Sequence, residues 1–138
     1  MKIKRFLILI VILLLVAGIT VFFLMSQRIN KFAKQDFNMI NLESLPNGVY
    51  QGSASALLVT AQVEVTVQAG QILKVKLLNH SHGPGHGAEE ICDNIVKINS
   101  PDVDSISGAT ASSVVIKAAV LEALKSGIPH ETENNPTR

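Results

Sequence analysis

Residues 107–113, with the sequence SGATASS, gather small and hydroxylated side chains where the pattern predicts that a helix begins. The first backbone N–H groups of a helix lack partners within the helix, and the helix dipole adds positive charge there. Gly108 would let a phosphate approach the backbone, and the hydroxyls of Ser107, Thr110, Ser112 and Ser113 could donate to it. Because serine and threonine are also common helix caps, the segment fits a phosphate site or an ordinary helix start.

Three histidines, His80, His82 and His86, lie in a segment of residues 79–87 that is rich in glycine and proline and is expected to be a loop. Imidazole is a common ligand of zinc and copper. Since no cysteine accompanies the histidines in this loop, we expect no metal site.

Cys92 is the only cysteine, so an intrachain disulfide is excluded. We expect Cys92 to be a small buried hydrophobe.

The elements that must position these residues begin with a predicted hairpin. Residues 61–68 alternate strictly between apolar and polar, with Val63, Val65 and Val67 on one face. After a short turn at residues 69–71, residues 72–78 repeat the alternation. The side chains expected to face the core there are Leu73, Val75 and Leu77. Residues 48–52, which follow the turn signal Pro46-Asn47, predict another strand.

Two helices are predicted after the hairpin. Residues 88–98 have isoleucines at helical spacing, and residues 110–126 have small residues suited to close packing on a sheet, followed by Gly127 and Pro129 as a stop. Lys117 and Glu122 are expected on the solvated face of the second helix. The order predicts an α+β fold in which helices pack against a small antiparallel sheet. Tyr50, the only Phe, Tyr or Trp beyond Phe37, either fills the core or contacts a ligand.

An apolar run over residues 6–25 is long enough to cross a bilayer as one N-terminal transmembrane helix. A secretory signal peptide is the alternative, but the run is longer than a typical signal core, and residues 25–28 offer no small-x-small cleavage site. We therefore divide the chain into a basic N-terminus (1–5), an anchor (6–25), a juxtamembrane linker or interfacial helix (26–44), a domain (45–127) and a polar tail (128–138).

Charge sets further limits. Basic residues flank the apolar run on both sides, so the positive-inside rule is nearly balanced, although the short basic N-terminus favours a domain outside the cytoplasm. From Leu45 onward acidic residues outnumber basic ones, and the basic residues form no continuous stripe. We therefore expect no nucleic-acid partner. The sequence contains no cluster that resembles a general acid and base beside a substrate cleft.

In order and spacing, several segments between residues 46 and 125 resemble the FMN-binding domain family. That family includes the membrane-anchored flavin subunits of sodium-pumping quinone reductases and of related ferredoxin-linked electron-transport complexes. The matching segments are residues 47–52, the hairpin 63–72, Asn79-His80, Ile95-Val96 and residues 103–110. The last segment fits the pattern Asp-x-x-Ser/Thr-Gly-Ala-Thr from Asp104 to Thr110.

The resemblance implies that Thr110 carries FMN through a phosphodiester bond, made from FAD by an extracytoplasmic flavin transferase. Some relatives hold FMN without a covalent bond, and this chain has Ser112 where many relatives have threonine. The residues that we expect at the flavin site are Asp104, Ser107, Gly108, Ala109, Thr110 and Ser112, together with Tyr50 and His80.

These inferences predict a single-pass protein of the cell membrane that relays electrons through FMN on the extracytoplasmic side. Its partners are expected to be membrane or extracytoplasmic redox proteins. A flavin-dependent reductase component and a flavin-free membrane-anchored interaction domain are the alternatives.

Overall fold

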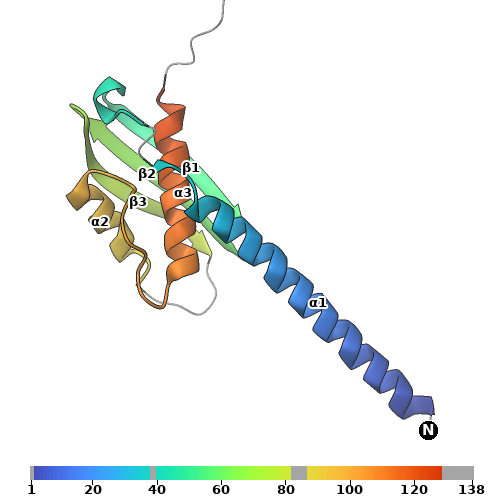
Figure 1. Cartoon of the computed structure of the whole chain (residues 1–138). Coiled ribbons are helices and arrows are strands. Elements are labelled where there is room, and N and C mark those ends of the chain that lie inside the picture. Colours follow the sequence, from blue (N-terminus) through green and yellow to red (C-terminus); the bar gives the residue numbers. More distant parts are fainter. Residues whose placement is uncertain (1, 38–39, 82–86, 129–138) are drawn as a thin grey trace, which may run out of the picture.

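The computed structural model describes residues 2–37, 40–81 and 87–128, which form a small antiparallel sheet and three α-helices (Figure 1). In chain order the elements are α1 (Lys2–Ala33), the short 3-10 helix η2 (Leu42–Ser44), β1 (Gly48–Ala56), β2 (Val59–Gln68), β3 (Gln71–Ser81), α2 (Glu90–Ile98) and α3 (Thr110–Ser126). The predicted α+β class is confirmed.

The sheet has the order β1-β2-β3, and both neighbouring pairs are antiparallel. As predicted, Val63, Val65 and Val67 of β2 are buried on one face. Strand β1 continues beyond the predicted residues 48–52 as far as Ala56, where it pairs with Val59. Its inward positions here are alanines, which give a weak alternation in the sequence.

Strand β3 corrects two predictions. Thr66 pairs with Lys74 and Val67 with Ile72, so Leu73 is an extra residue in a β-bulge. Ile72 is therefore buried, while Leu73, which was predicted to face the core, is 49% exposed. The strand also runs to Ser81, so residues 79–81 are strand and not loop.

A second irregularity of β3 decides where His80 points. Gln62 pairs with Asn79 and Val63 with Leu77, which leaves Leu78 as another extra residue. After this shift His80 pairs with Ala61, which is buried on the inner face of the sheet. Without the bulge, the alternation of the strand would have turned His80 to the outer face.

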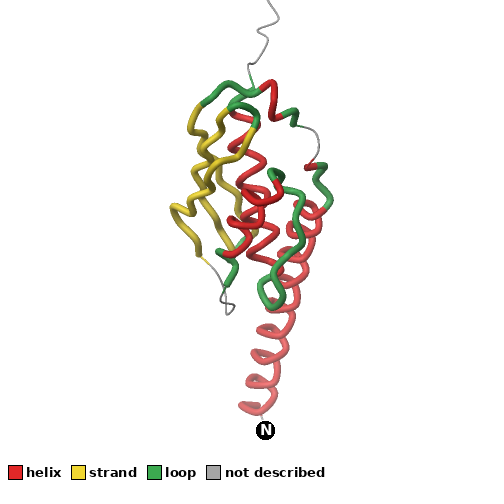
Figure 2. Tube along the Cα trace, turned by 90° about the vertical axis from the view of Figure 1, so that its left-hand side faces the viewer, coloured by secondary structure: helices red, strands yellow, loops and turns green. Residues whose placement is uncertain are grey.

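Helices α2 and α3 cover one face of the sheet, with α3 against β1 and β2, and α2 against β3 (Figure 2). Gly52 of β1 permits the close approach of α3. A Cβ atom on Gly52 would lie 2.2 Å from the Ala119 carbonyl oxygen and 2.3 Å from the Ala123 backbone nitrogen. The predicted close packing of the small residues of α3 is confirmed.

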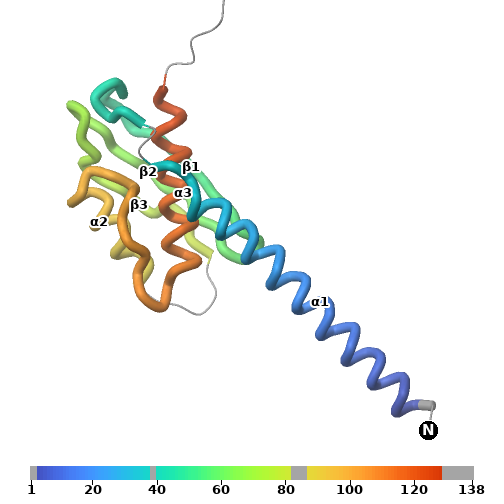
Figure 3. The backbone as a smooth tube through the Cα atoms, in the orientation of Figure 1, coloured from blue at the N-terminus to red at the C-terminus, as the bar shows by residue number. Residues whose placement is uncertain are grey.

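Helix α1 leaves the domain as a long rod, which the trace in Figure 3 shows from end to end. Within the described residues, the segment Ile3–Ala33 is the one helix long and apolar enough to cross a membrane. The helix does not stop at Met25 but runs through residues 26–33 of the predicted juxtamembrane stretch. There Met25, Ile29 and Phe32 pack against the core of the domain.

Candidate functional site

The start of α3 has an unusual cap. Its N-cap residue is Ala109, and no side chain among the described residues forms a cap hydrogen bond at that position. Thr110 is the first helical residue and is exposed, and the preceding Gly108 has a φ of 79°. The hydroxyls that the sequence offers here therefore do not serve as the ordinary cap. The helix start therefore lacks a side-chain acceptor, and its backbone N–H groups and positive dipole end suit an anion.

The serines of the segment divide into two groups. Ser113 is fully buried, and its Oγ atom accepts a 3.0 Å hydrogen bond from the Ile106 backbone N–H. Ser112 is also buried, at 6% exposure, whereas Ser107 is exposed like Thr110. Ser113 thus fixes the loop from within, and Ser107 and Thr110 present hydroxyls to the outside.

Lys117 holds the same loop from the side, in contrast to the predicted solvated position. Its ammonium group donates a hydrogen bond to the Val103 carbonyl and lies 4.8 Å from the centre of the Phe37 ring. Burial lowers the pKa of Lys117, while Asp102 and Asp104 act in the opposite direction. The contact connects α3, the Asp104 loop and the segment after α1. This contact could not be predicted from the sequence, since an isolated lysine is normally exposed.

His80 lies on the inner face of β3 with a side chain that is only 5% exposed. Its Nδ1 atom is 3.9 Å from a carboxylate oxygen of Glu89, just before α2. His82 and His86 lie outside the described residues. Within the described part of the chain, no three His, Cys, Asp or Glu side chains are grouped as a metal site would require. His80 is therefore a buried polar group beneath the start of α2.

Cys92 is buried on α2, as predicted. Its pKa is raised to about 11, chiefly by burial and further by the nearby carboxylates of Asp93 and Glu89. A protonated, buried thiol suits packing better than chemistry.

Tyr50 lies at the opposite end of α3 from Thr110. Its hydroxyl donates a 2.6 Å hydrogen bond to the Pro46 carbonyl, and its ring packs on Gly127, where a Cβ would come within 2.5 Å of the ring. Helix α3 separates Gly127 from Thr110 by about 25 Å, at 1.5 Å per residue. The structure therefore places Tyr50 in core packing and does not bring it to the Thr110 loop.

The contacts of β1 show which end of the domain carries the start of α3. Tyr50 faces Gly127 and Gly52 faces Ala119 and Ala123, so α3 runs antiparallel to β1. The start of α3 therefore lies toward the end of β1, on the half of the sheet where Ala61 pairs with Ala54 and His80. Asp104, Thr110 and His80 belong to this half of the domain.

The same end of α3 meets the long helix. Ala111 lines a cavity of about 260 Å³ with Phe22, Met25, Ser26 and Ile29 of α1. The helix start that follows Gly108 is thus beside the part of α1 that leaves the predicted membrane segment.

Comparison with known families matches residues 59–125 to the FMN-binding domain. The match covers β2, β3, α2 and the loop from Asp104 to Thr110, and ends within α3. The predicted resemblance to the FMN-binding domain family is confirmed over this part of the chain. A search of curated proteins finds no match to the chain.

The family match supports FMN as the cofactor, and the start of α3 fits the phosphate end of that molecule. Gly108 leaves open space where a Cβ would stand, and its positive φ is one that other residues rarely adopt. Thr110 and Ser107 contribute exposed hydroxyls beside the helix start. The residues present are therefore compatible with a bound flavin phosphate.

Proposed function

We propose that this protein is a membrane-anchored electron carrier whose FMN is bound through a phosphodiester bond to Thr110. One observation carries the proposal. The hydroxyl of Thr110 is exposed at a helix start that lacks a side-chain cap, directly after Gly108 and Ala109, within the part that matches the FMN-binding domain.

The residues of the loop have separate tasks in this proposal. The N–H groups of the first turn of α3 and the Ser107 hydroxyl would donate to the phosphate, while Gly108 would leave space for it. Ser113 and Lys117 would keep the loop in place through their bonds to Ile106 and Val103.

Attachment uses FAD as the donor. The Thr110 oxygen would bond to the phosphorus of the FMN half, the bond from that phosphorus to the bridging pyrophosphate oxygen would break, AMP would leave with that oxygen, and the hydroxyl proton would be released. A flavin transferase outside the cytoplasm would catalyse this step, which requires the domain to lie on that side. Bound FMN supplies the capacity to accept and pass on electrons.

The position of α1 supports a role close to the membrane. Phe22 and Met25 of α1 lie beside Ala111, so the anchor and the start of α3 are adjacent. Electrons would be exchanged with membrane or extracytoplasmic redox proteins near this end of the domain. His80, on the same half of the sheet, is better placed than Tyr50 to influence the flavin.

Production of the full chain with a flavin transferase and FAD tests the proposal. The wild type should gain visible flavin absorbance and an intact mass increased by one FMN. Thr110→Ala should lose the increment, while Ser105→Ala, which removes a hydroxyl of the same loop that has no task in the proposal, should retain it. A wild-type protein that folds, lacks the increment and has no affinity for FMN would favour a flavin-free interaction domain.

A further inference from the structure

The turn between β1 and β2 consists of two exposed leucines. Ala56 pairs with Val59, which leaves Leu57 and Leu58 as the whole turn. Their side chains are 43% and 65% exposed. The exposed part of these two side chains gains no stabilisation from the core of the domain, since it stays in contact with water.

The backbone of this turn also disfavours leucine. Leu57 has a φ of 57°, in the left-handed region that side chains with a Cβ rarely adopt. Two-residue hairpin turns with this geometry at the first position usually contain glycine or asparagine. At the other hairpin of the sheet, small residues, Ala69 and Gly70, occupy the positive-φ positions. Leu57 is thus disfavoured both by its exposure to water and by its backbone conformation, and Leu58 by its exposure to water.

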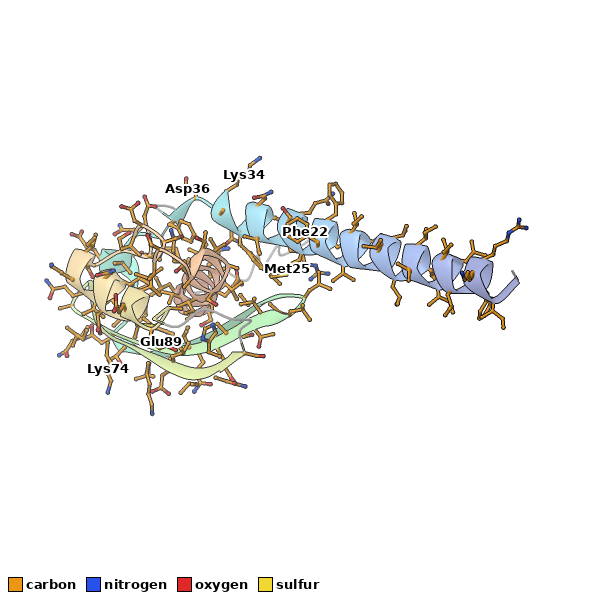
Figure 4. The ribbon with its side chains drawn as sticks, turned by 90° about the horizontal axis from the view of Figure 1, so that it is seen from below. Phe22, Met25, Lys34, Asp36, Lys74 and Glu89 are labelled. Carbon is orange, nitrogen blue, oxygen red and sulfur yellow. The ribbon has the colours of Figure 1, made fainter. Side chains whose placement is uncertain are left out.

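The turn lies beside the predicted membrane helix. Helix α1 contacts β1, and the start of α3 packs on Met25 and Ile29 from the same half of the domain. Seen from below, the β1–β2 hairpin extends along α1 to about the level of the labelled Met25 (Figure 4). Met25 is the last residue of the apolar run. The leucine turn therefore reaches the height at which α1 would leave the bilayer.

Charge on α1 supports the same surface. Arg28 and Lys31 are exposed in the turns of α1 that follow Met25. Basic side chains at this height suit lipid headgroups, especially anionic ones, while the leucines suit the acyl chains just below them. Along the membrane normal, Arg28 and Lys31 would thus lie at the level of the headgroups, and the leucines at the level where the acyl chains begin.

We propose that Leu57 and Leu58 insert into the surface of the bilayer that α1 spans, as a second membrane contact of the domain. The proposal rests on the membrane anchor of the proposed function. A single transmembrane helix can tilt in the bilayer, and the domain packed on it would tilt with it. A second contact restricts that motion and holds the start of α3, with Thr110, toward the membrane.

Tryptophan fluorescence tests this contact cleanly, because the chain contains no tryptophan. Leu58→Trp in the full chain is reconstituted into vesicles of phosphatidylcholine and phosphatidylglycerol, with or without brominated acyl chains. We expect a blue-shifted emission that loses intensity in the brominated lipid. Leu73→Trp is the matched control, since Leu73 is also an exposed leucine of the sheet but lies near the opposite hairpin. Its emission should stay water-like and unquenched.

Leu14→Trp, in the middle of the apolar run, separates the two proposals. Quenching of Leu14→Trp with water-like emission from Leu58→Trp would overturn the leucine contact and leave the anchor intact. Absence of quenching at both positions would overturn the anchor as well.

A second probe covers the case in which Leu58→Trp misfolds. Leu58→Cys can be labelled with a polarity-sensitive thiol dye, because the native Cys92 is only 6% exposed in the fold. Dye emission typical of lipid would support the contact, and emission typical of water would overturn it. Thermal unfolding of each variant verifies that the domain is folded.

Discussion

Thr110 and Ser107 expose hydroxyls at a helix start where Ala109 offers no side-chain acceptor. An alanine at the N-cap position forgoes about 1 kcal/mol that serine or aspartate would provide. A bound phosphate would satisfy the same N–H groups, so an uncapped start costs less in a protein loaded with FMN. The proposed site and the missing cap thus have one explanation at the residue scale.

Cys92 gives a residue-scale prediction about reactivity. Its thiol has a pKa near 11 in the fold, against an ordinary value of 9.0. The folded state therefore binds this proton more tightly, and the resulting stability is full below pH 9.0 and is lost as the pH rises toward about 11. Iodoacetamide at about pH 8 should modify the folded protein slowly and the denatured protein readily, as measured by mass spectrometry. Equal rates in both states would contradict the burial of Cys92.

Among the elements, α3 and β1 approach each other so closely that Gly52 has no room for a side chain. Backbone atoms of Ala119 and Ala123 surround the position, and they cannot rotate away as a side chain can. The alanines of α3 and the glycine of β1 therefore form one packing unit.

Gly52→Ala should lower the free energy of unfolding by about 3 kcal/mol, because the added methyl group overlaps the α3 backbone. Gly48→Ala in the same strand is the matched control, since its Cβ would first meet the Tyr50 hydroxyl at 3.2 Å. Its effect should stay below about 1 kcal/mol. Urea unfolding of both variants measures the difference, and equal effects would contradict the close helix–strand contact.

Asn99 connects α2 to the β2–β3 turn. It ends α2 with a φ of 58°, its Oδ1 atom accepts a 2.7 Å hydrogen bond from the Ile72 N–H, and its Nδ2 group donates to the Gly70 carbonyl at 3.2 Å. One residue thus combines a left-handed helix end with a side-chain clamp.

Two substitutions separate these roles. Asn99→Gly keeps the backbone conformation but removes the clamp, while Asn99→Ala removes the clamp and strains the backbone as well. We expect losses of about 1–2 kcal/mol for Asn99→Gly and about 1 kcal/mol more for Asn99→Ala. Thermal or urea unfolding measures both. If Asn99→Ala were more stable than Asn99→Gly, the left-handed conformation of residue 99 would not be a cost to stability.

Some features of the strands and helices could be predicted from the sequence, and others could not. Strand β2 and helix α3 could be predicted because strict alternation and a long run of small and apolar residues each indicate one structure. The bulges at Leu73 and Leu78 could not, because an extra residue changes the face of the strand without changing its composition. For the same reason the burial of His80 had no sequence signal. The core packing of Tyr50 and the hydrogen bond of Lys117 could not be predicted either, because they depend on contacts between residues that are far apart in the sequence.

For the whole molecule, the packing of α1 on the domain decides how the proposed flavin site would meet a membrane. Met25, Ile29 and Phe32 lie against the core, so the exposed apolar part of α1 and the domain are joined by continuous helix. The stretch after the apolar run therefore does not act wholly as a flexible linker.

Trypsin digestion in detergent tests this coupling, because cleavage after Arg28 or Lys31 requires local opening of α1. Ile29→Ala removes packing worth about 1 kcal/mol, which should raise the population of the open form and the cleavage rate about fivefold. Gln27→Ala, at an exposed position of the same helix, should cleave like the wild type. Equal rates for Ile29→Ala and wild type would mean that α1 does not depend on this contact.

The most direct test of the account is the site of flavin attachment. Trypsin releases residues 98–117 as one peptide, which contains Thr110 together with Ser100, Ser105, Ser107, Ser112 and Ser113. Fragmentation of this peptide by mass spectrometry, after production with the flavin transferase, should locate one FMN on Thr110. An FMN on any of the serines would contradict attachment at Thr110. An unmodified peptide from protein produced with the transferase and FAD would contradict covalent attachment altogether.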